Sequence, residues 1–182
     1  MNNTSTSDIF DEFAEDLLGE RTARPLIIIG ASKVDNLLFQ ILNVYLLPKR
    51  AKAKDQDELL EGDRPLGTFS ARIKMCYRLG LIDETLYLAL EQLRALRNPS
   101  AHSIAFDILK SPTREYISAL RKSVAIRHSF RQTKRRYFDN AALTKIDELQ
   151  CVLLTLCVLL ELIYKKVSTT CGSKVALSIA SR

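Results

Sequence analysis

The chain has 182 residues, of which 47% are hydrophobic, and it carries a formal net charge of +6. This length suits one domain whose core needs no disulfide or metal to hold it, and so small a charge excess does not identify a nucleic-acid-binding protein by itself. Only six glycines and five prolines interrupt long segments of helical periodicity. The sequence therefore predicts an all-α fold, a single-domain helical bundle of about six to seven helices.

Several classes of protein are excluded by missing motifs. The four cysteines form no CxxC pair and have no histidine at ligand spacing, which argues against a zinc site or a disulfide framework and suits a reduced, cytoplasmic environment. No GxG or HExxH motif occurs, so neither a cofactor nor a metal is expected. The first residues are polar and acidic, without the charged and apolar regions typical of a signal peptide, and the longest apolar run, residues 151–160, is too short to span a bilayer. No membrane is therefore expected as a partner.

The first third of the chain predicts two helices and a loop. Residues 1–6 look frayed, and an acidic amphipathic helix is expected over residues 8–18. Pro25 fits the first turn of a second helix, residues 25–47, in which apolar residues recur at three- and four-residue steps. Residues 48–63 are first basic and then acidic with little apolar content, which is typical of a surface loop.

The remaining elements are expected in quick succession. Thr68 or Ser70 caps a helix that Gly80 stops, and Asp83 caps another that runs through Arg97. Further helices are predicted over residues 99–109 and 113–121. Residues 143–167 form a long helix that is apolar nearly all round, which is usual at the centre of a bundle or in a subunit interface. The domain is expected to cover residues 1–167, followed by a weakly ordered tail, residues 168–182.

One basic segment separates the two helix-rich parts. No acidic residue occurs between Tyr116 and Phe138, and we interpret this stretch as a surface loop rather than a helix that reads a DNA groove. Its seven cations are candidates for salt-dependent contacts with a DNA or RNA backbone. They are Arg121, Lys122, Arg127, Arg131, Lys134, Arg135 and Arg136.

The segment RNPSAH, residues 97–102, is the candidate catalytic site. Asn98 as N-cap and Pro99 as the first helical residue predict a new helix, whose geometry would bring Arg97 to His102. A helix N-terminus attracts anions and keeps an imidazole neutral, so His102 could act as a base beside an anion-binding Arg97, as a metal-independent ribonuclease requires. In the structural alternative, Arg97 pairs with an acid such as Glu91 or Asp107 while His102 packs between helices.

About forty residues around this segment resemble the mannitol repressor family. Asp63 and Arg64 depart from the family pattern, because they stand where the family has a glycine directly before the proline. The resemblance implies a compact all-α protein that exerts negative control on the transcription of a sugar operon. The residues that carry it are Pro65, Leu66, Gly67, Ser70, Arg72, Lys74, Tyr77, Leu79, Gly80, Leu96, Arg97 and His102.

The same segment also resembles the Arg-x4-His signature of the HEPN superfamily, whose active members are dimeric ribonucleases with a polar residue, here Asn98, after the arginine. Two hypotheses follow. The first is a non-catalytic regulator that acts through a protein partner or through nucleic-acid contacts without sequence preference. The second is a HEPN-type ribonuclease, a toxin or defence effector checked by an antitoxin, in which a homodimer joins two Arg97/His102 pairs. A catalytically silent dimeric scaffold is the third alternative.

Overall fold

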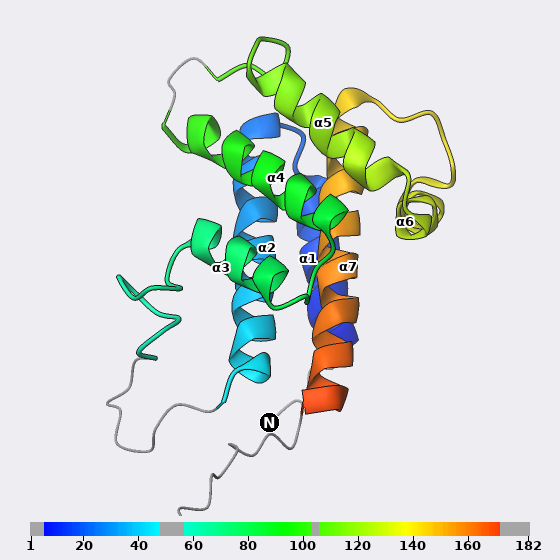
Figure 1. Ribbon diagram of the computed structural model, residues 1–182. Coiled ribbons are helices and arrows are strands. Elements are labelled where there is room, and N and C mark those ends of the chain that lie inside the picture. Colours follow the sequence, from blue (N-terminus) through cyan, green and yellow to red (C-terminus); the bar gives the residue numbers. More distant parts are fainter. Residues whose placement is uncertain (1–5, 48–56, 103–105, 172–182) are drawn as a thin grey trace, which may run out of the picture.

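The computed structural model describes residues 6–47, 57–102 and 106–171, and over these ranges the chain forms helices and no strand. The predicted all-α fold class is thus confirmed. Figure 1 shows how the helices are arranged. In chain order they are α1 (Thr6–Gly19), α2 (Ala23–Tyr45), α3 (Phe69–Arg78), α4 (Glu84–His102), α5 (Thr113–Ala125), α6 (His128–Phe138) and α7 (Lys145–Cys171).

Helices α2 and α7 lie side by side at the centre of the bundle, and α4 and α5 cross them (Figure 1). Every residue of α7 from Cys151 to Cys157 is buried, as expected of a helix that is apolar all round. Gly30 allows α2 to approach α7 closely, because a Cβ atom at this position would lie 2.8 Å from Cδ1 of Leu153 on α7. The long apolar helix of the sequence is therefore a core element of the bundle.

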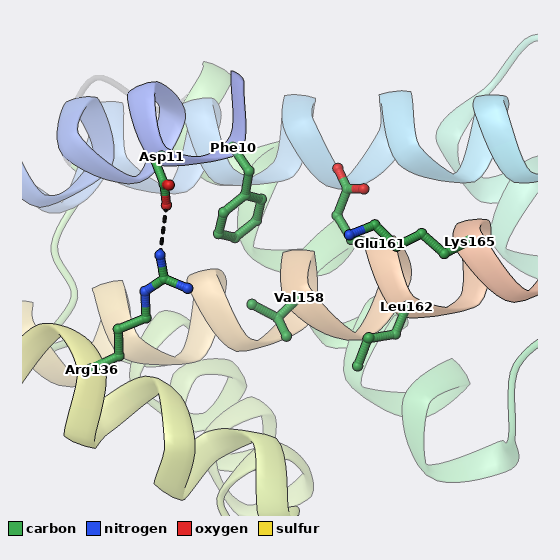
Figure 2. Close-up of a pocket in the computed structure, with 7 residues that line it drawn as sticks. All are labelled: Phe10, Asp11, Arg136, Val158, Glu161, Leu162 and Lys165. Carbon is green, nitrogen blue, oxygen red and sulfur yellow. Dashed lines mark hydrogen bonds and ion pairs between the residues drawn. The ribbon is translucent and has the colours of Figure 1, made fainter. Parts of the chain in front are cut away.

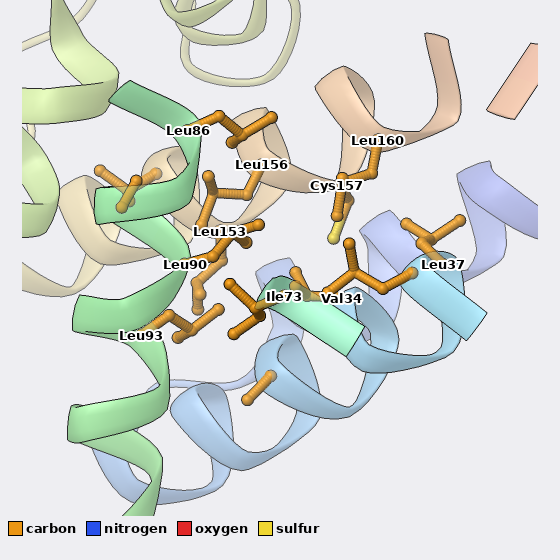
Figure 3. Close-up of a cluster of buried hydrophobic side chains, with 14 of the residues drawn as sticks. Val34, Leu37, Ile73, Leu86, Leu90, Leu93, Leu153, Leu156, Cys157 and Leu160 are labelled. Atoms are coloured by element: carbon orange, nitrogen blue, oxygen red, sulfur yellow. The ribbon is translucent and has the colours of Figure 1, made fainter. Parts of the chain in front are cut away.

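The part of the core that Figure 3 shows is built from apolar side chains of four helices, and α1 and α5 add further buried residues to it. Burial of each such side chain contributes about 1.5–3 kcal/mol relative to its exposure. Helix α2 is also long and apolar enough to cross a membrane, but half of its apolar window is buried in the bundle, as in a core helix. Side chains labelled in Figure 3 include Val34 and Leu37 of α2, Ile73 of α3, Leu90 and Leu93 of α4, and Leu153, Leu156 and Leu160 of α7.

A buried amide joins α1 to α7. The side-chain nitrogen of Gln150 donates to the carbonyl oxygens of Leu17, Leu18 and Glu20 at 3.1, 3.0 and 2.9 Å. The carbonyls of Leu17 and Leu18 belong to the last turn of α1, where a helix lacks its own donors, and Glu20 follows directly after the helix. Gln150 therefore supplies a donor to three carbonyls at this helix end, while its own Oε1 has no partner within the described residues.

The predicted helix boundaries around α3 and α4 are confirmed by their capping contacts. The Thr68 hydroxyl accepts a hydrogen bond from the backbone N–H of Ala71 at 3.2 Å. The Asp83 carboxylate accepts one from the N–H of Leu86 at 2.7 Å. Gly80 has a φ of +69°, a left-handed conformation that side chains other than glycine adopt at a cost.

Two predicted elements are wrong. Helix α4 continues through Pro99 to His102, so no helix begins at Asn98 and none covers residues 99–109. The buried face of Leu93 and Leu96 extends to Ser100, and tertiary packing therefore outweighs the unfavourable proline. The Ser100 hydroxyl donates to the carbonyl of Arg97 at 2.8 Å within the same helix.

The second error concerns the basic segment, which is helical rather than a loop. Only residues 126 and 127 separate α5 from α6. Ser129 and Thr133 are buried in α6, with Phe130 and Tyr137 half-buried beside them, and α6 packs on α7. Two predicted chain-end segments are also too long: Thr6, expected to be frayed, begins α1, and residues 168–171, expected in the tail, continue α7 to Cys171. The other residues of the predicted frayed end and tail, 1–5 and 172–182, and residues 48–56 of the predicted loop lie outside the described ranges.

Candidate functional site

Arg72, one of the motif residues, holds the turn before α3 against α2. Its guanidinium donates to the carboxylate of Asp35 at 2.7 Å and to the carbonyl oxygens of Leu60 and Gly67 at 2.8 and 3.1 Å. It also lies over the ring of Phe39, 5.3 Å from the centroid. Its side chain is only 11% exposed, so Arg72 stabilises the packing of the turn against α2.

The turn that Arg72 holds, residues 57–68, is shaped by its own local contacts. The Asp57 carboxylate accepts hydrogen bonds from the N–H groups of Leu59 and Leu60, at 2.8 and 2.9 Å. A Cβ atom on Gly67 would overlap the carbonyl oxygen of Gly62, so position 67 admits only glycine. The motif glycine is thereby explained by the close approach of two backbone segments.

A cavity of about 390 Å³ lies between this turn, α2 and α4. The α4 side contributes Arg94, Arg97 and Asn98, and the opposite walls carry hydroxyl groups and the Asp35 carboxylate, which is paired with Arg72. Arg94 is paired with Glu91 at 2.9 Å. Within the described part of the chain, Arg97 has no ion pair or hydrogen bond through its guanidinium. The cavity thus carries an unneutralised positive charge. The hydroxyl-bearing residues are Ser32 of α2, Thr68 and Ser70.

The helix start that the sequence predicts between Arg97 and His102 is not formed. Because α4 is continuous, five steps of about 100° place positions 97 and 102 about 140° apart around the helix axis. The side chain of His102 lies outside the described residues. The alternative partners are engaged elsewhere, Glu91 with Arg94 and Asp107 with Lys110 at 3.9 Å. The ribonuclease pair with Asn98 stays a prediction, now without its helix-capping geometry.

Three of the seven candidate nucleic-acid-binding cations are committed to ion pairs. Arg121 contacts Glu148 at 2.9 Å and Arg136 contacts Asp11 at 2.9 Å, both at the surface. The third pair, Arg127 with Asp83 at 2.6 Å, fastens the start of α6 to the start of α4.

The Asp83–Arg127 pair has an electrostatic consequence. The hydrogen bond from Arg127 lowers the pKa of the Asp83 carboxyl, and the backbone N–H of Leu86 lowers it further against the opposing effect of burial. Asp83 is thus held ionised while it caps α4. Arg127 is therefore part of the scaffold of the fold.

The other four cations have no ion pair among the described residues: Lys122 on α5 and Arg131, Lys134 and Arg135 on α6. On α6 the exposed positions His128, Arg131, Gln132 and Arg135 follow a helical spacing of three and four residues. They form one solvent-facing stripe, which we call the α6 stripe. Sequence reasoning found these cations but not the helix that aligns them.

A second, mainly apolar hollow of about 180 Å³ lies between α1, α6 and α7, and no sequence pattern indicates it (Figure 2). Phe10, Val158 and Leu162 face it, and the Asp11–Arg136 ion pair lies at one end. The residues that line it are brought together only by the packing of three separate helices.

Three cysteines of the described ranges, Cys76, Cys151 and Cys157, are free and buried. Burial raises the pKa of Cys76 and of Cys157 to about 12 and that of Cys151 to about 11, so these thiols stay protonated. In the ranges that the structure describes, no three histidine, cysteine, aspartate or glutamate side chains gather as metal ligands would. We therefore assign the three cysteines to the packing of the core.

Comparison with curated proteins gives one kind of relative. No family model matches the chain. Over 91 residues the chain is 35% identical to the mannitol operon repressor of Escherichia coli strain K12. The matched segment covers 48% of this chain and 46% of the repressor. The repressor of E. coli O6:H1 matches to the same extent. The chain thus matches about half the length of these curated relatives.

Two solved structures share the fold. The first is YggD from Shigella flexneri, a possible transcriptional regulator, which matches with a TM-score of 0.58 at 16% sequence identity. The superposed region covers 92% of this chain and 99% of the YggD chain. The MtlR-HPr complex from E. coli matches with a TM-score of 0.56 at 21% identity over 85% of this chain and 98% of that one. The family resemblance carried by the motif residues is confirmed in this form: over about half its length, this chain is a homologue of the mannitol operon repressor.

Proposed function

We propose that this chain is a repressor-like negative regulator of transcription that acts through a protein partner. The observation that carries the proposal is the 35% identity to the mannitol operon repressor over 91 residues. The solved complex of a protein of the same fold, MtlR, with HPr supports a protein as the partner. HPr, or a protein that resembles it, is the first candidate.

The distribution of charge also favours a protein partner over sequence-specific DNA binding. Reading bases requires several side chains on one element that reach the base edges. Here Arg121, Arg127 and Arg136 are held by acids of the same chain. The basic segment therefore offers fewer free donors than its sequence implies.

The proposal is tested by titrating the purified full chain with HPr from the same organism in a calorimeter. We expect saturable binding, and we expect deletion of the gene to raise transcription of the operon it controls. A charge-matched small acidic protein serves as the control titrant. Absence of HPr binding together with unchanged transcription in the deletion strain would overturn the proposal.

A second candidate activity, contact with nucleic acid without sequence preference, is favoured by the α6 stripe. If only Lys122, Arg131, Lys134 and Arg135 neutralise phosphates, the logarithm of the DNA-binding constant should fall with the logarithm of salt concentration with a slope of about 3.6. Engagement of all seven cations would give about 6. A slope near zero would refute this activity.

Three further expectations accompany the proposal and need their own measurements. A cytoplasmic location follows from a role in transcription. A homodimer is tested by light scattering of the eluted protein. The ribonuclease hypothesis is tested by RNA cleavage in EDTA, comparing the wild type with His102→Ala. Cleavage that this substitution abolishes would replace the pure regulator by an enzyme.

A further inference from the structure

We propose that the cavity between α2, the 57–68 turn and α4 binds the phosphate group of a small phosphorylated molecule. Its volume of about 390 Å³ is within the range of small-molecule pockets, about 300–1,000 Å³. Nothing in the regulatory proposal requires this site. The inference stands on the lining of the cavity alone.

The charge of the lining selects an anion. One acid, Asp35, lines the cavity and is paired with Arg72 at 2.7 Å. Glu91 is neutralised as well, by the lining residue Arg94 at 2.9 Å. Arg97 lines the same cavity with no such partner within the described residues. One positive charge is left over, and a guanidinium binds carboxylate or phosphate through parallel N–H donors.

The count of donors favours phosphate over carboxylate. The hydroxyls of Ser32 and Ser70 make no hydrogen bond within the described part of the chain, and the side-chain amide of Asn98 lies beside Arg97 on the rim. Thr68 uses its oxygen to accept from Ala71 and keeps its O–H to donate. A phosphate monoester has three terminal oxygens to satisfy so many donors, whereas a carboxylate has two.

The cavity is held open before any ligand arrives. Arg72 ties Asp35, Leu60 and Gly67 together, so the α2 wall and the turn wall are fixed relative to each other. The first N–H groups of α3, at Phe69 and Ser70, lie at the same wall and add to the positive potential. Such preorganisation reduces the entropy that binding must overcome.

The test is calorimetric titration of the full chain with glycerol 3-phosphate, inorganic phosphate, acetate and glycerol, at fixed ionic strength. We expect saturable binding of the two phosphates, weaker binding of acetate and none of glycerol. Glycerol 3-phosphate stronger than inorganic phosphate would identify a phosphorylated metabolite as the ligand; the reverse would identify free phosphate. No saturable binding of either phosphate overturns the proposal.

Matched arginine variants separate the site from general charge. Arg97→Ala should weaken phosphate binding about tenfold to a hundredfold, because one charge-assisted contact is lost, whereas Arg97→Lys should keep part of it. Arg78→Ala, which removes an exposed cation from the last turn of α3, is the control and should leave binding unchanged. Equal losses in Arg97→Ala and Arg78→Ala would refute the site.

Two further measurements test whether Arg97→Ala remains folded and whether RNA is the ligand instead. Circular dichroism should show Arg97→Ala as helical as the wild type, since Arg97 is exposed. A short single-stranded RNA is titrated in parallel: if it binds through Arg97 and neither phosphate does, the small-molecule proposal is wrong. Because no HPr or promoter is present in these titrations, their failure would leave the regulatory proposal untouched.

Discussion

Arginines serve opposite purposes in the two regions of this molecule that the sequence singles out. In the motif region, Arg72 is 11% exposed, makes three hydrogen bonds and fastens a turn to α2. In the basic segment, Arg131 and Arg135 are exposed on α6 and make no ion pair within the described ranges. A largely buried guanidinium needs partners to offset its desolvation, and Arg72 has them at Nη1 and Nη2, although its Nε has none within the described residues. An exposed guanidinium is already solvated by water.

This difference separates residues that build the fold from residues free to bind a partner. Gly67 and Arg72 shape and hold the turn, so their presence in a family motif needs no ligand to explain it. Arg97 belongs to the same motif but contacts no acid among the described residues, and its guanidinium lines a cavity. The motif therefore contains both a structural arginine and an available one.

The largest expected change in stability comes from removing the largely buried side chain of Arg72. Arg72→Ala should lower the free energy of unfolding by about 3 kcal/mol or more, because it leaves Asp35 without its partner and two carbonyls without a donor. Urea denaturation measures the change. Arg72→Lys should recover only part of it, since an ammonium cannot reproduce the planar fork. A loss below about 0.5 kcal/mol, the size typical of surface substitutions, would remove the contrast between the two regions.

Next in size is the proline inside α4. Pro99→Ala should stabilise the protein by about 1 kcal/mol or more, because alanine restores an N–H that can donate to the carbonyl of Ala95 within the continuous helix. Thermal unfolding measures the change. If Pro99 instead began a separate helix, as the sequence alone predicts, the substitution would bring no gain.

A similar or smaller effect is expected where the basic segment meets α4. Asp83→Ala removes both the cap of α4 and the partner of Arg127, and should cost about 1 kcal/mol at neutral pH. Asp83→Asn keeps a capping side chain and should cost less. Comparison of the two variants separates the contribution of the helix cap to the free energy of unfolding from that of the ion pair.

The effect of Asp83 should also depend on pH. Its pKa is lower in the folded chain than the ordinary value of about 3.9 in an unfolded one. Its contribution is therefore complete above about pH 4 and disappears as the pH falls through the lowered pKa. The stability difference between wild type and Asp83→Ala, followed by urea denaturation from pH 7 to pH 3, should shrink accordingly; a difference that grows in acid would contradict this assignment.

The smallest change in stability is expected on the α6 stripe. Arg131→Ala and Arg135→Ala should each alter the free energy of unfolding by no more than about 0.5 kcal/mol, since neither side chain is buried. The double variant should nevertheless lower the salt slope of DNA binding by about 2. A large loss of stability with an unchanged slope would assign these residues to the scaffold instead.

Local chemistry in the sequence was sufficient for the fold class and for many boundaries. The capping roles of Thr68 and Asp83 and the stop at Gly80 depend on contacts within a few residues, so they could be read directly and are confirmed. The all-round apolar character of α7 likewise placed it in a buried position. These features are decided by backbone propensity and by periodic burial, which a sequence displays.

Long-range contacts decided the rest. Asn98 and Pro99 carry a strong local signal for a helix start, but the buried face of α4 extends past them and the helix continues. The many cations of residues 128–138 concealed an amphipathic helix, because its buried side consists of Ser129 and Thr133 and partly of aromatic rings. Likewise, nothing near Arg72 or Arg97 in the sequence distinguishes them. The acid that pairs with Arg72, Asp35, is distant along the chain on α2, and the cavity that Arg97 lines is closed by α2 and the 57–68 turn. Only the tertiary structure could therefore show that one arginine is paired and the other is free to bind.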